Sequence, residues 1–94
     1  MCTSIVEISD CAGMGKGDGG EWITLTHSVV SYDHPHHALL EEAITIDFVN
    51  RGLGPGARVA VELTLEAAKE LNGALARAIA AAEIEESARL RSRD

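Results

Sequence analysis

Three of the four histidines in this chain occupy four consecutive positions, within the segment "SYDHPHHALLEE" at residues 31–42. His34, His36 and His37 are followed by two carboxylates, Glu41 and Glu42. Imidazole nitrogens and carboxylate oxygens are the donors that Zn²⁺ and other divalent transition metals bind in proteins. We therefore interpret the segment as a candidate metal site, with zinc as the first candidate ion.

Pro35 limits the geometry of this segment. Proline moves the preceding residue, His34, out of the helical region, and it is itself favoured at the first position of a helix. If the segment stays extended, His34 and His36 point to the same side. If a helical turn begins at Pro35, His34, His37 and Glu41 lie near one face instead. Both arrangements remain open.

Further donors lie close to the cluster or need the fold to reach it. Asp33 and Glu42 are near enough to be ligands or to orient an imidazole. Cys2 offers a soft thiolate ligand, but strand pairing would have to carry it to the histidines. His27 stands alone on a predicted strand, as a core residue with satisfied hydrogen bonds or as a third nitrogen ligand. The candidate metal ligands are His34, His36, His37, Glu41, Glu42 and Cys2.

Other interpretations of the histidines do without a metal. The segment could be a solvated loop between strands, a proton-sensitive contact between subunits, or an acid–base site that pairs a histidine with a carboxylate. Three histidines in four positions is a strong local enrichment in a chain with only four. We therefore place a small metal-binding protein first, with catalysis on a small metabolite as an open extension. The alternative is a metal-free homodimeric interaction or accessory module without catalytic activity.

The spacing of apolar residues predicts an α+β fold in a single domain, residues 1–94. Alternation predicts strands at about 3–9, 21–32, 43–50 and 58–63. Helical spacing predicts one long helix at about 65–87, capped by Thr64 and followed by a charged tail at 88–94. We expect a four-stranded antiparallel sheet with this C-terminal helix packed on one face. The residues of the predicted apolar stripe of the helix are Ala68, Leu71, Leu75, Ala78, Ile79 and Ala82.

A glycine-rich segment separates the first two predicted strands. Gly13 to Gly20 includes five glycines, which predicts a mobile loop or a wide turn. Its roles would be a flap over the site or a plain linker. Lys16 among the glycines resembles a phosphate cradle, but a strand follows here, whereas a phosphate-binding loop runs into a helix.

Composition narrows the class of partner. A net charge of −7 argues against nucleic acid, and three aromatic residues provide few platforms for base stacking. No apolar run approaches the ~18 residues that span a membrane, and the first residues do not resemble a secretory signal. We therefore expect a cytoplasmic protein. Because a four-stranded sheet with one helix leaves a face and two edges uncovered, we also expect a homodimer.

Several short motifs together resemble a family of small actinobacterial proteins of unknown function. They are "MCT" at the start, "GKG" followed by Trp22, "DHPxH", "IDFVN" and "LGPGARVAVELT". The resemblance implies that His34 and His37 matter more than His36. It also implies a histidine in relatives where this chain has Glu42, so this chain would offer an oxygen in place of a nitrogen. It implies no particular reaction.

Overall fold

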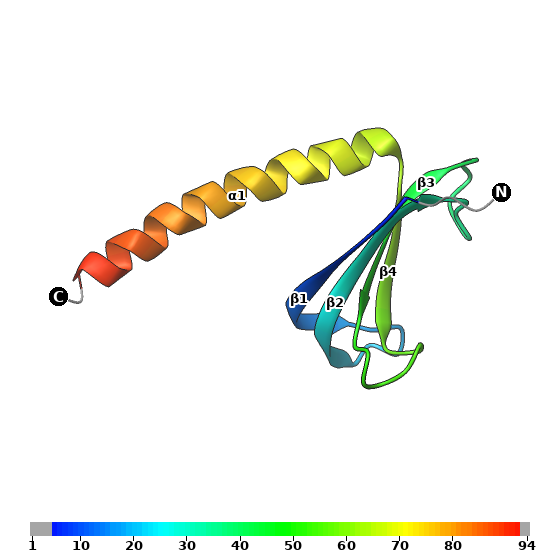
Figure 1. Ribbon diagram of the computed structural model, residues 1–94, viewed down its shortest axis with the longest axis horizontal. Coiled ribbons are helices and arrows are strands. Elements are labelled where there is room, and N and C mark those ends of the chain that lie inside the picture. The colour runs from blue at the N-terminus through cyan, green and yellow to red at the C-terminus, as the bar shows by residue number, and fades with distance from the viewer. Residues whose placement is uncertain (1–4, 93–94) are drawn as a thin grey trace.

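The computed structural model describes residues 5–92 of the chain. Four strands form one antiparallel sheet in which each strand pairs with its neighbours in sequence, and one long helix follows (Figure 1). The elements are β1 (Val6–Lys16), β2 (Trp22–Asp33), β3 (Ala43–Val49), β4 (Arg58–Leu63) and α1 (Leu65–Ser92). The predicted α+β class, the four-stranded antiparallel sheet and the single long C-terminal helix are confirmed.

The glycine-rich segment belongs mostly to β1, so the predicted mobile loop over its whole length is wrong. β1 continues through a register shift between Asp10 and Gly13 and ends at Lys16. A Cβ added at Gly15 would lie 3.0 Å from Cγ2 of Val59 and 3.3 Å from Leu25. Glycine therefore allows this part of β1 to approach β4 closely. The turn itself is confined to residues 17–21, where the backbone N–H of Gly17 donates to the carbonyl of Glu21 at 2.8 Å.

The strand register divides the sheet into two chemically different faces. Residues paired across antiparallel strands project to the same side, and Val30 pairs with Ile46, which pairs in turn with Val61. One face, here called the apolar face, carries Val30, Ile44, Ile46, Phe48, Val59, Val61 and Leu63 together with Ser28 and Tyr32. The opposite face, here called the polar face, carries Ser31, Thr45, Asp47, Arg58 and Glu62 together with Val29, Val49 and Ala60. The candidate site develops on the polar face.

Thr64 caps the helix as the sequence predicts. Its Oγ1 accepts the backbone N–H of Ala67 at 3.0 Å, which satisfies one of the free donors of the first turn. α1 continues to Ser92, so most of the predicted charged tail is helical. Arg89 pairs with Glu86 at 2.6 Å within this last part of the helix.

The helix does not pack along the sheet, which corrects the expectation that it covers one face. None of its residues is buried, and Figure 1 shows α1 leaving the end of β4 and running away from the strands. A single residue, Thr64, separates β4 from α1, so the chain has no connection long enough to fold the helix back. Within residues 5–92 no large side chain is fully buried, and no helix is long and apolar enough to cross a bilayer.

Candidate metal centre

The histidine segment is a loop, residues 34–42, that joins β2 to β3 and closes over one end of the polar face. Asp33 and Ala43 form the last pair between these strands. Ala43 has no exposed surface, although it is a small residue at a strand end. The segment is a series of bends, so it adopts neither of the two arrangements considered for Pro35.

The carboxylate of Glu62 holds this loop on the sheet. Its Oε2 accepts the backbone N–H of His36 at 2.5 Å, and its Oε1 accepts those of His37 and Ala38, both at 2.8 Å. Hydrogen bonds to an ionised acceptor are the strong ones. We call this arrangement the Glu62 clamp. The backbone donors of His36 and Ala38, followed by the backbone donor of His37 and the electrostatic attraction of its ring, outweigh desolvation and lower the pKa of Glu62 from 4.5 to about 2.

Beside the clamp, the loop brings three potential ligands together. Asp33, His34 and Glu42 each offer one donor atom, and these atoms all lie within 4.8 Å of one another. His34 Nδ1 lies 3.3 Å from Oε1 of Glu42 and 2.9 Å from the backbone carbonyl oxygen of Glu41. Oδ1 of Asp33 accepts the backbone N–H of His34 at 2.7 Å. We call these three residues the ligand triad.

Some of the predicted ligands belong to the ligand triad, and others lie outside it. His34 and Glu42 belong to the ligand triad, and Asp33, considered as a further ligand, completes it. His36 and His37 serve the Glu62 clamp through their backbone, and their rings are outside the triad. Glu41 contributes its backbone carbonyl. Cys2 lies outside the described residues.

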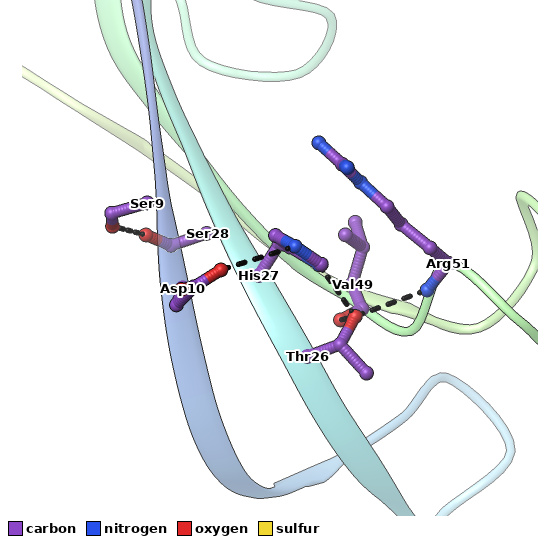
Figure 2. Close-up of polar contacts among 7 residues, drawn as sticks. All are labelled: Ser9, Asp10, Thr26, His27, Ser28, Val49 and Arg51. Atoms are coloured by element: carbon purple, nitrogen blue, oxygen red, sulfur yellow. Dashed lines mark hydrogen bonds and ion pairs between the residues drawn. The ribbon is translucent and has the colours of Figure 1, made fainter.

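His27 lies in the middle of β2 and is a strand residue with satisfied hydrogen bonds, as one of the two interpretations proposed. Figure 2 shows its ring between Asp10 and Thr26. Nε2 lies 3.3 Å from Asp10 Oδ1, and Nδ1 lies 2.8 Å from Thr26 Oγ1. Thr26 in turn donates to the carbonyl of Val49 at 3.2 Å and accepts the backbone N–H of Arg51 at 3.1 Å. This network ties β1, β2 and the end of β3 together and leaves His27 outside the ligand triad.

A polar groove of about 200 Å³ runs from the ligand triad along the polar face. Asp33, His34 and His36 line one end of it. Further along, the guanidinium of Arg58 donates to Asp47 at 2.9 Å. Arg58 is the positive charge of the groove, and it comes from the strand next to the one that carries Asp47. The groove is therefore small, polar and open to solvent beside the triad.

Sequence reasoning missed two residues of this region, Glu62 and Arg58. Both lie on β4, which reads as an ordinary alternating strand. A signal was present, because Glu62 is the one acidic residue in that strand and it follows two valine positions that face the other side. Nothing in the linear sequence showed that its partner would be the backbone of residues 36–38.

Comparison with known proteins places the chain in a family but supplies no activity. A family model described as a family of unknown function (DUF6295) matches residues 1–88. No curated protein matches the chain, and no solved structure matches it either. Since the match covers nearly the whole chain, this protein belongs to DUF6295, a family of unknown function.

Proposed function

We propose that this chain is a small metal-binding protein in which Asp33, His34 and Glu42 hold a divalent transition metal. One observation carries the proposal: the three donor atoms already lie within 4.8 Å of one another. Zinc bound at its usual ligand distances has tetrahedral ligand atoms about 3.3 Å apart. Nδ1 of His34 and Oε1 of Glu42 are 3.3 Å apart, so this pair needs little movement to share an ion.

The donor set suggests which metals to try. One imidazole nitrogen and two carboxylate oxygens suit Zn²⁺, and they also suit harder ions such as Mn²⁺. Three protein ligands leave a coordination position open, which is the arrangement of catalytic zinc sites. In the metal-free protein the hydrogen on Nδ1 of His34 is shared with the carbonyl of Glu41 at 2.9 Å. A metal that binds through Nδ1 therefore replaces this hydrogen bond, and the neutral ring then carries its hydrogen on Nε2.

The groove supports an extension of this proposal to a metal-dependent enzyme. A metal held by the triad would face the polar groove of about 200 Å³. This groove shares His36, Arg58, Ala60 and Glu62 with a pocket of about 670 Å³, within the ~300–1,000 Å³ typical of small-molecule sites. The substrate would be a small metabolite. The Arg58 guanidinium also lines the groove, but it is paired with Asp47 at 2.9 Å, so its charge is already balanced there.

Metal titration of untagged protein tests the proposal, with zinc and manganese followed by calorimetry. We expect about one equivalent bound, and a His34→Ala variant that binds at least about 100-fold more weakly, since it loses a ligand. His37→Ala is the matched control, because its ring is outside the triad, and its affinity should stay within about threefold. No uptake of either metal would refute the proposal. If His37→Ala lost as much metal affinity as His34→Ala, the ligands would instead include both His34 and His37, as predicted from the sequence.

The second candidate function is a metal-free homodimeric accessory module. The observation that favours it is the exposed apolar stripe of α1, where Leu75 is 56% exposed. In this case the His34→Ala variant would keep both its assembly and its stability. Zinc titration of the wild type separates the two functions, because only the metal-binding protein takes up about one equivalent, whereas assembly is compatible with both.

A further inference from the structure

The helix and the sheet leave two apolar surfaces open on the same chain. Leu71, Leu75 and Ile79 of the apolar stripe are 48%, 56% and 49% exposed. The side chains of the apolar face are only half-buried, although they come from three adjacent strands. α1 diverges from the sheet beyond its first turns (Figure 1). Neither surface therefore covers the other within one chain.

The overall dimensions of the chain show how much of its surface stays exposed to solvent. The radius of gyration is 16.1 Å, whereas a compact domain of this length has about 12 Å. The chain exposes 7220 Å², whereas a compact monomer of 10.0 kDa exposes about 5,200 Å². The difference, about 2,000 Å² for each chain, exceeds the ~800 Å² that each partner buries in a standard interface and matches obligate homodimers.

We infer that α1 of one copy docks its apolar stripe on the apolar face of a second copy, and that the second copy does the same in return. Each chain carries both the apolar stripe and the apolar face, so a two-fold dimer forms this contact twice and buries both surfaces in both copies. The lengths agree as well. The apolar stripe from Ala68 to Ala82 is about 21 Å long, and the seven residues of β3, which lies at the centre of the apolar face, span about 23 Å.

Two other arrangements of the helix leave at least one of the apolar surfaces exposed to water. The chain's own helix cannot cover the face, because Thr64 is the whole connection between β4 and α1 and its side chain caps the first turn. A helix-to-helix dimer would cover the stripe of α1 and leave the apolar face of both sheets in water. Only exchange of helices between copies buries both surfaces. The inference does not depend on the ligand triad, which lies on the other face of the sheet.

Sedimentation equilibrium of the full chain gives the first test. We expect a species of twice the 10.0 kDa chain mass at micromolar concentration. Leu75→Glu should weaken dimerisation at least about 100-fold, because it puts a charge into an apolar contact in both copies. The matched control is Ala80→Glu, an exposed position about 140° around the helix from Leu75. This variant should dimerise like the wild type, and far-UV circular dichroism checks that both variants keep their helix.

Photo-crosslinking identifies the docked surface. p-Benzoylphenylalanine replaces Leu75, and the band of doubled mass is digested and sequenced by mass spectrometry. A crosslink to strand peptides that contain Val30, Ile46 or Val61 of the other chain supports the inference. A crosslink to the other chain's α1, or a single species of monomer mass across the concentration range, overturns it. Equal effects of Leu75→Glu and Ala80→Glu would also overturn it.

Discussion

The Glu62 clamp makes the sharpest prediction about the loop that carries the ligand triad. Three backbone N–H groups share one carboxylate, two of them on Oε1 and one on Oε2. In a Glu62→Gln variant one of these oxygens becomes an NH₂ group, which cannot accept a hydrogen bond. At least one of the three backbone donors must then lose its partner, and the remaining bonds lose the negative charge.

The expected effect is local opening of the loop. A hydrogen bond to a charged acceptor stabilises a closed state by roughly 10–100-fold in population. We therefore expect the amide protons of His36, His37 and Ala38 to exchange about 10–100-fold faster with solvent in Glu62→Gln. Because the clamp positions the loop that carries His34 and Glu42, zinc affinity should fall by about the same factor, as it does for residues that orient metal ligands.

The pH dependence provides an independent check with a definite sign. The pKa of Glu62 is lowered from 4.5 to about 2 in the folded chain, so its ionised form favours the closed loop. This stabilisation is fully present above about pH 5 and is lost as the pH falls through the folded pKa of about 2. Between these limits the wild type should lose stability with acid more steeply than Glu62→Gln, measured as urea midpoints.

The natural control is Glu66→Gln, since Glu66 is an exposed carboxylate in α1 whose partner is Lys69 at 3.6 Å. It should leave amide exchange in the loop and zinc affinity unchanged. The reasoning would be refuted if Glu62→Gln kept the wild-type exchange rates at residues 36–38. It would also be refuted if Glu66→Gln changed those rates equally.

Two further predictions concern the elements that hold the sheet and the helix. Thr64→Ala removes the acceptor of the Ala67 N–H and should lower stability by about 1 kcal/mol, with a matching loss of helical signal; an unchanged urea midpoint would contradict the cap. Gly15→Ala places a Cβ 3.0 Å from Val59 and should cost about 1–3 kcal/mol through overpacking. Gly13→Ala is its control, because a Cβ there meets nothing within 4 Å, and equal losses in both variants would refute the close approach.

Local patterns were sufficient to predict the elements of this fold. Alternating apolar residues in β2, β3 and β4 predict strands because successive side chains on a strand point to opposite faces. Thr64 predicts the start of α1 because its hydroxyl can satisfy a free backbone donor. Such signals depend only on neighbours in the chain. They failed in the second half of β1, where the glycines suggested a loop; the role of Gly15 there is set by Val59, far away in sequence.

The candidate site was predictable in its location but not in its membership. The cluster of histidines at residues 34–37 drew attention to the loop where Asp33, His34 and Glu42 come together, and His34 and Glu42 were among the predicted ligands. The rings of His36 and His37 looked equivalent to that of His34. Their backbone N–H groups are used by Glu62 instead, and that contact joins residues 25 or more positions apart.

The amino-acid sequence by itself therefore determined β2, β3, β4, the capped helix and the position of the histidine-bearing loop, because each follows from the periodicity and the local hydrogen-bonding preferences of neighbouring residues. Only the tertiary structure decided which donors converge and where the helix goes. Convergence of Asp33, His34 and Glu42 depends on how Glu62 on another strand bends the loop. The direction of α1 depends on a connection of one residue, Thr64, which directs its apolar stripe away from the sheet of its own chain.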